Sequence, residues 1–159
     1  MMEHNEKEYL ALCQKILSEI DKTRLNKIFS YPEMELEPDF LGFLEVYKAL
    51  AKRIPKRFAI VDLGCNHAFQ AWLFREHVLY VGVDNGIPSE YRLWTENANH
   101  FDMSIQDFLK THYKNMFINK TVFICSYVPD IEARKLTAKC RYFYSYYPPD
   151  EENKRLPKR

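Results

Sequence analysis

The sequence is poor in glycine, with only four residues in 159, and three of the four fall between positions 64 and 86. We therefore expect the backbone geometry that glycine permits mainly in this region. The dinucleotide-binding pattern G-x-G-x-x-G is absent, because Asn66 and Phe69 stand where its second and third glycines would follow Gly64. This absence disfavours NAD or FAD and makes a nucleotide-dependent oxidoreductase the weakest of the enzyme interpretations.

Cysteine pairs with metal-ligand spacing are absent as well. The four cysteines are Cys13, Cys65, Cys125 and Cys140, and their gaps fit no zinc motif, so we expect no metal. Cys65 and Cys125 lie in apolar runs, which predicts buried free thiols and a reducing, cytoplasmic environment. No signal peptide opens the chain and no apolar run approaches the ~20 residues of a membrane span, so no membrane partner is expected.

An excess of charge of either sign is also lacking, since 23 Lys and Arg face 22 Asp and Glu. Without a basic stripe, nucleic-acid binding is not expected as the main role. The tail 151–159 is locally basic and is interpreted as a flexible, solvated end. Length and composition predict one globular domain over 1–159, with a helical part at 1–56 and a core at 57–150.

Helical periodicity predicts two leading helices, over 3–29 and 39–54. From position 58 onward, short apolar runs alternate with amphipathic segments, which predict helices over 68–77, 89–97, 106–115 and 131–138. Strands are predicted over 58–63, 78–83, 103–105, 121–126 and 141–147. This alternation indicates an α/β fold, a doubly wound, mostly parallel, Rossmann-like sheet of about five strands.

The turn after the first predicted strand is a candidate ligand site. In a doubly wound sheet, ligands bind beyond the carboxyl ends of the strands, where a glycine lets the backbone approach the ligand. An acidic residue about twenty residues later accepts the ribose hydroxyls. Gly64 is followed at this interval by Asp84, at the end of the second strand. The spacing predicts a nucleoside site with Asp84 as the ribose acceptor.

Three segments resemble motifs of the class I S-adenosylmethionine-dependent methyltransferases. "DLGCNHA" (62–68) resembles their first motif, D/E-x-G-x-G-x-G, with Asn66 and Ala68 in place of two glycines. "YVGVD", ending at Asp84, resembles the second motif, and "SIQDF" (104–108) the later acidic one. The resemblance covers roughly 58–126 and implies S-adenosylmethionine as cofactor and S-adenosylhomocysteine as product. The cofactor-binding residues that it implies are Asp62, Gly64, Cys65, Asn66, His67, Asp84, Asn85, Asp107 and Phe108.

Five of these residues also have a purely structural interpretation. Asp62 could cap the turn, and Asp84 and Asn85 could belong to an ordinary turn. Asp107 could N-cap the following helix, and His67 could be a surface histidine at a helix start.

Catalytic residues are expected after the fourth strand, where the resemblance places the methyl acceptor. Tyr127 is predicted to line the substrate pocket and Asp130 to act as a base, although Ser126 and Asp130 could merely shape a turn. The motif [D/N]-P-P-[Y/F] of amino-methyltransferases is absent there. The acceptor is therefore unassigned, and a catalytically inactive, methyltransferase-like binding or partner module is the alternative function.

Two other segments have predicted roles. Tyr31, Pro32 and Met34 are predicted to belong to a lid over the cofactor. The aromatic strand 141–147 is predicted to leave a sheet edge that pairs with a second copy or another protein, or lies under the leading helices.

Overall fold

The structure of the chain is a computed structural model that describes residues 7–8, 11–12, 15, 38–112, 118–125, 135, 140–145 and 155–158. Most of the predicted helices 3–29 and 131–138 lie outside these ranges. The predicted lid residues and the predicted catalytic residues Tyr127 and Asp130 lie outside them too.

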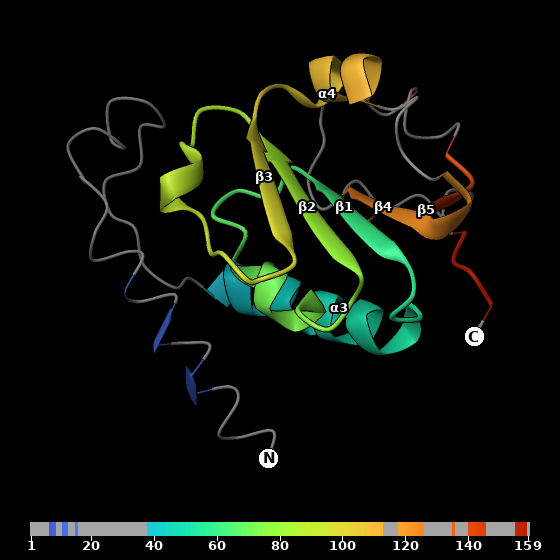
Figure 1. The fold of residues 1–159 in the computed structure, drawn as a ribbon. Helices are drawn as coiled ribbons and strands as arrows, with labels where there is room; N and C mark the ends of the chain where they lie inside the picture. The colour runs from blue at the N-terminus through green and yellow to red at the C-terminus, as the bar shows by residue number, and fades with distance from the viewer. Residues whose placement is uncertain are drawn as a thin grey trace.

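A five-stranded sheet forms the centre of the described part (Figure 1). Its strands are β1 (Ala59–Leu63), β2 (Leu79–Asp84), β3 (Ala98–Asp102), β4 (Thr121–Cys125) and β5 (Tyr142–Ser145). Their order is β3-β2-β1-β4-β5, and all four neighbouring pairs are parallel. The chain moves outward from β1 to β3 and then returns to the other side of β1. This reversal makes the carboxyl end of β1 the switch point of a Rossmann-like α/β fold.

Helices cover both faces of the sheet, as the predicted double winding requires. Helix α3 (Pro38–Arg53) lies on one face and α4 (Ile105–His112) on the other (Figure 1). The remaining described helices are short 3-10 turns, η1 (Phe69–Phe74), η2 (Ser89–Tyr91) and η4 (Ile118–Lys120). None of the helices in the described ranges is both long and apolar enough to span a membrane.

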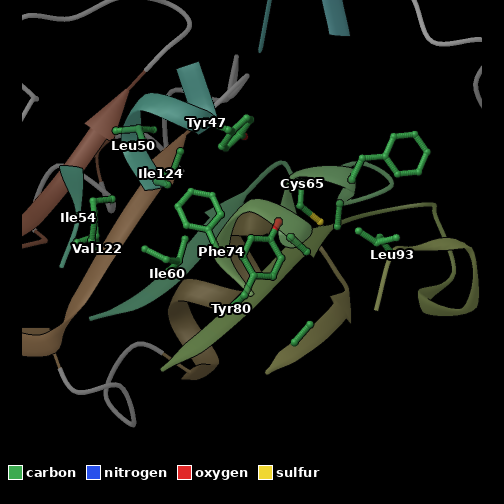
Figure 2. Packing of buried hydrophobic residues seen from close by; sticks show 14 of the residues in the cluster. Tyr47, Leu50, Ile54, Ile60, Cys65, Phe74, Tyr80, Leu93, Val122 and Ile124 are labelled. Atoms are coloured by element: carbon green, nitrogen blue, oxygen red, sulfur yellow. The ribbon is translucent and has the colours of Figure 1, made fainter. Parts of the chain in front are cut away.

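Two hydrophobic layers hold these helices to the sheet, because successive strand residues point to opposite faces. On the α3 face, Tyr47, Leu50 and Ile54 pack against strand residues that include Ile60, Val122 and Ile124 (Figure 2). On the α4 face, Phe108 and Leu109 pack against a second set from the same strands. The members of that set are Val61, Leu63, Val81, Val83, Phe123, Cys125 and Phe143.

The prediction of a strand over 103–105 is wrong, since the third strand is Ala98–Asp102. This strand lies at the edge of the sheet and has the polar sequence ANHFD, so it shows no apolar run. The predicted helices 68–77 and 89–97 are reduced to η1 and η2. In η1, Phe69, Gln70 and Ala71 are buried in succession, so the segment lies within the core and does not present an amphipathic face.

The C-terminal segment pairs with the last strand. Phe143 and Arg155 exchange backbone hydrogen bonds, with N–O distances of 2.8 and 2.7 Å, in an antiparallel bridge. Pro157 is buried, and its carbonyl accepts a hydrogen bond of 2.6 Å from Arg53 Nη1 of α3. The edge of β5 is thus partly covered by the chain itself. Pairing of this edge with a second copy or another protein stays a prediction.

Candidate functional site

The loop after β1, residues 64–68, has a left-handed backbone at three alternate positions. The φ angles are 81° at Gly64, 53° at Asn66 and 54° at Ala68. These are the three positions at which the resembled motif carries glycine. Left-handed φ costs a residue with a side chain roughly 1–2 kcal/mol, less for asparagine, so the chain keeps the glycine-type geometry at an energetic cost.

Protein acceptors take most of the N–H groups of this loop. Gly64 N and Cys65 N both donate to Val83 O, at 2.8 and 3.1 Å, and Ala68 N donates to Cys65 O at 2.8 Å. Asn66 N donates to the carboxylate of Asp84 at 2.7 Å. The loop is therefore held rigidly against the end of β2.

The carboxylate of Asp84 points toward the β1 loop, which is the orientation needed to accept ribose hydroxyls at this position. One carboxylate oxygen accepts from Asn66 N and the other from Asn85 N, at 2.7 and 2.8 Å. A carboxylate offers about four lone-pair sites, so the described residues leave two of them for a ligand. Asp84 is half-buried, while Asn66 and Asn85 are exposed, so this carboxylate can be reached from solvent. Gly86 N donates to Asp102 at 2.9 Å, so Asp84 and Asn85 also belong to the turn that the alternative interpretation described.

Asp62 lies on the core side of the loop and is completely buried. Its carboxylate accepts three side-chain hydrogen bonds, from Tyr47 Oη at 2.9 Å, Tyr80 Oη at 2.6 Å and Gln70 Nε2 at 2.5 Å. Burial raises the pKa of Asp62 to about 6, although the three donors oppose this shift. Gln70 Nε2 also donates to Cys65 O at 3.1 Å. Asp62 therefore supports the loop from within, through side chains and not through a backbone cap.

Cys65 and His67 are buried on either side of Asn66, so the surface interpretation of His67 is wrong. The Nδ1 atom of His67 lies 3.0 Å from Tyr91 O, which can only accept, so Nδ1 carries the proton. Its Nε2 is buried without a hydrogen-bond partner among the described residues, and burial lowers the pKa of His67. Burial raises the pKa of the Cys65 thiol, and Cys65, Cys125 and Cys140 are buried cysteines that form no disulfide within the described residues.

Close packing beneath the loop explains one of the four glycines. A Cβ added at Gly82 in β2 would lie 2.6 Å from His100 Nδ1 and 2.9 Å from Cys65 Sγ. Burial also lowers the pKa of His100 to about 4, so this ring is neutral at pH 7. Any side chain at position 82 would push on the loop through Cys65.

Arg92 is a central residue of the site that the sequence did not reveal. Its side chain is only 1% exposed. It donates to three backbone carbonyls, Asn66 O at 3.1 Å, Phe101 O at 2.9 Å and Asp84 O at 2.8 Å. These carbonyls belong to the β1 loop, β3 and β2, so one guanidinium joins three chain segments at the carboxyl edge. No local pattern distinguishes it from a surface arginine.

Asp107 and Phe108 lie in the first turn of α4. Ser104 Oγ accepts from Asp107 N at 3.0 Å, so Ser104 is the N-cap and the interpretation of Asp107 as the cap is wrong. Asp107 is exposed in the first turn, whereas Phe108 is 1% exposed and packs in the α4-side core. Asp107 can therefore be reached by a ligand, and Phe108 serves the core.

The acceptor side of the site falls outside the described residues. Cys125, the last residue of β4, pairs with Leu63 of β1, so β4 ends beside the start of the loop. Tyr127 and Asp130 follow it in the sequence, and their roles stay predictions.

The described residues fit the nucleoside part of S-adenosylmethionine better than the rest of the cofactor. Asp84 has acceptor sites left for a ribose diol, and Asn66, Asn85 and Asp107 are exposed polar groups. Asp62, Cys65 and His67 are buried and shape the loop from below. Among the described residues, no group of three or more His, Cys, Asp or Glu side chains is placed to hold a metal ion.

Comparison with known proteins adds no family to this picture. No protein-family model matches the chain, and no curated protein matches it significantly.

Proposed function

We propose that the chain is an S-adenosylmethionine-dependent methyltransferase whose cofactor binds at the carboxyl ends of β1 and β2. Asp84 would hold the ribose, Asn66 and Asn85 would contact the nucleoside, and Asp107 would lie near the adenine. S-adenosylmethionine, when bound, supplies a methyl group on a sulfonium, and the protein then has mainly to align the acceptor. Tyr127 and Asp130 are the proposed acceptor-side residues, and the acceptor is unassigned.

One observation carries this proposal. Asn66 and Ala68 keep the left-handed backbone of glycine, at φ of 53° and 54°, beside a carboxylate that faces the loop. A loop with only a connecting role could relax to ordinary φ values and avoid the cost. Backbone outliers of this kind persist where the surroundings over-determine them, and they cluster at ligand sites.

A second function, a methyltransferase-like binding module without cofactor, is favoured by a different observation. The N–H groups of Gly64, Cys65, Asn66 and Ala68 all donate to protein acceptors. A loop whose amides are satisfied internally offers few backbone donors to an anionic ligand group.

Calorimetric titration with S-adenosylmethionine and S-adenosylhomocysteine separates the two functions. We expect both compounds to bind the wild-type chain and Asp84→Asn to weaken them at least about tenfold, because a hydrogen bond to a charged group contributes about 1.5–3 kcal/mol. Asp102→Asn is the matched control. It removes a carboxylate from the residue of β3 that pairs with Asp84, and this carboxylate accepts one backbone N–H where Asp84 accepts two.

The control should bind like the wild type and melt close to it without ligand, whereas Asp84→Asn, which loses one of two backbone hydrogen bonds, should melt somewhat lower but remain folded. Absence of heat and of any thermal shift at ~millimolar ligand would reject the enzyme and leave the binding module. An equal loss in both variants would show that Asp84 is not the ribose acceptor.

A further inference from the structure

A hollow of about 430 Å³ lies at the amino ends of β1 and β5, whereas the β1 loop lies at the carboxyl end of β1. It is bordered by the residues that precede or open β1 and β5 and by the C-terminal segment. The lining residues are Arg57, Phe58, Arg141, Tyr142, Arg155, Leu156, Pro157 and Lys158. We call this the basic hollow, because four of its eight lining residues are cations and none is acidic.

The four cations come from three separate parts of the chain. Arg57 precedes β1, Arg141 precedes β5, and Arg155 and Lys158 belong to the C-terminal segment. The chain as a whole carries almost as many acidic residues as basic ones, 22 against 23. A lining with four cations and no acid is therefore a local concentration of charge that the composition does not explain. Like charges gathered in one hollow repel each other and are stabilised by an anion.

Two of the guanidinium groups are ordered by aromatic rings. The Cζ atom of Arg57 lies 5.1 Å from the ring centroid of Phe58, and that of Arg141 lies 5.3 Å from the ring of Tyr142. The two rings pack edge to face, with centroids 5.4 Å apart. Arg141 Nη1 also donates to Asn119 Oδ1 at 2.9 Å. Such contacts hold guanidinium groups in place before a ligand arrives, which reduces the entropy lost on binding.

The C-terminal segment is fixed where it meets the hollow. Its backbone pairs with Phe143, Arg155 Nη2 donates to Cys140 O at 2.9 Å, and Pro157 accepts from Arg53 at 2.6 Å. Residues 155–157 of this tail are therefore held against the fold, with Pro157 buried and Arg155 exposed. Arg155 and Lys158 of this segment therefore have defined positions beside the start of β5.

We propose that the basic hollow binds the phosphate groups of an anionic ligand. Arginine offers a planar set of donors that matches phosphate oxygens, and Lys158 adds a point charge at the rim. The phosphate could belong to a small phosphorylated compound or to a nucleic-acid backbone, which share this chemistry. The basic hollow is separate from the site at the β1 loop, so this proposal does not depend on the proposed methyltransferase function.

The test uses the full chain with two probes, inorganic pyrophosphate by calorimetry and a labelled twelve-nucleotide oligouridine by fluorescence anisotropy. The variant Arg57→Gln/Lys158→Gln removes two lining cations that make no hydrogen bond or ion pair with other described residues. The control Arg75→Gln/Lys110→Gln removes the same charge away from the hollow. Arg75 lies 4.3 Å from the Trp72 ring centroid, so it matches the geometry of Arg57.

We expect at least one probe to bind, with affinity that falls as salt rises, and the hollow variant to bind at least about tenfold more weakly. The control should bind within about twofold of the wild type, and Asp84→Asn should not change phosphate binding. Pyrophosphate binding alone would assign a small phosphorylated compound, and oligouridine binding lost in the hollow variant would assign a nucleic-acid backbone. Absence of binding by both probes, or equal loss in the control, would overturn the proposal.

Discussion

Asp62 carries the unusual chemistry of this fold at the scale of single residues. The acidic residue of the resembled motif is here enclosed by two phenols and one amide, at 2.5 to 2.9 Å. Burial of a carboxylate disfavours its charged form, and the three donors compensate only in part, so the pKa of Asp62 rises to about 6. The motif residue thus has a structural role that depends on pH.

The first prediction concerns the pH dependence of stability. Because the pKa of Asp62 is 3.8 without burial and about 6 in the fold, the folded chain binds this proton more tightly than the unfolded chain. The stability contributed by the protonated carboxyl is complete below pH ~4 and is lost as the pH rises through ~6. The difference of about two pKa units corresponds to about 3 kcal/mol. Asp62→Asn cannot ionise, so its free energy of unfolding relative to wild type should rise by about 3 kcal/mol from pH 4 to pH 7.

Urea unfolding at the two pH values measures this change. The exposed carboxylate of Asp102 provides the control, because Asp102→Asn should shift relative to wild type by only a small fraction of that amount. If the two variants respond alike, burial of Asp62 does not govern the pH dependence.

The second prediction concerns the backbone of the β1 loop. Asn66 is exposed with a φ of 53°, so Asn66→Gly should stabilise the fold by up to about 1 kcal/mol, and Asn66→Val should destabilise it by about 1–2 kcal/mol. Asn85 is also exposed but does not have positive φ, so Asn85→Gly should destabilise slightly. Thermal melting of the four proteins measures the order. A stabilising Asn85→Gly would show that the gain does not come from left-handed backbone.

Some of these residue-level facts could be predicted and others could not. The pairing of Asp84 with the glycine turn follows from a local pattern, because adjacent parallel strands end at the same edge. The partners of Asp62 could not be predicted, since Tyr47 and Tyr80 lie 15 and 18 residues away on different elements. Their approach depends on how α3 and β2 pack against β1, which no local pattern encodes.

At the scale of elements, Arg92 joins three neighbouring segments at the carboxyl edge of the sheet. Its guanidinium donates to carbonyls of the β1 loop, β2 and β3, and it is almost completely buried. The three carbonyls replace the water that would otherwise solvate the guanidinium, and the guanidinium holds the β1 loop against the carboxyl ends of β2 and β3. The geometry of the candidate ligand site therefore depends on a residue behind it.

The third prediction is that Arg92→Met lowers the free energy of unfolding by about 3 kcal/mol, because it removes three hydrogen bonds that a charged, buried donor makes to backbone carbonyls. Amide hydrogen exchange at Cys65 and Asn66 should also speed up. Arg75→Met is the control, since Arg75 is partly exposed and donates to one carbonyl, Trp72 O at 2.8 Å. It should cost less than about 1 kcal/mol, measured by urea unfolding. Equal costs would mean that Arg92 does not hold the three segments together.

Elements differ in how well the sequence predicts them, and burial explains the difference. Strands β1, β2 and β4 are buried on both faces, and their apolar runs locate them to within one or two residues. The edge strand β3 is polar and mostly accessible, so hydrophobic patterning places it wrongly. The 3-10 turn η1 is buried at successive positions, so its mostly apolar sequence predicts a longer amphipathic helix in its place.

At the scale of the whole molecule, the last described segment protects an edge of the sheet. The bridge between Phe143 and Arg155 takes backbone groups that would otherwise face solvent, and Leu156 packs against the α3-side core. Exposed strand edges pair readily with other chains. The segment therefore opposes self-association through β5.

The fourth prediction is that removal of residues 151–159 promotes association and lowers stability. Gel filtration over a range of concentrations should show a larger species for the truncated chain, and its melting temperature should fall, because Leu156 and Pro157 lose buried surface. Full-length Lys158→Gln keeps the bridge and should elute as the wild type does. A truncated chain that elutes unchanged and melts at the wild-type temperature would show that the segment does not protect the edge.

The length of the central strand has a consequence for any two ligands of this protein. Strand β1 has five residues, so at about 3.3 Å each its two ends are roughly 17 Å apart. A compound small enough to fill the basic hollow cannot reach Asp84 through the sheet. A molecule bound at one end would therefore leave the other end vacant for an unrelated molecule. The two binding free energies should be additive unless a single long polymer reaches both ends.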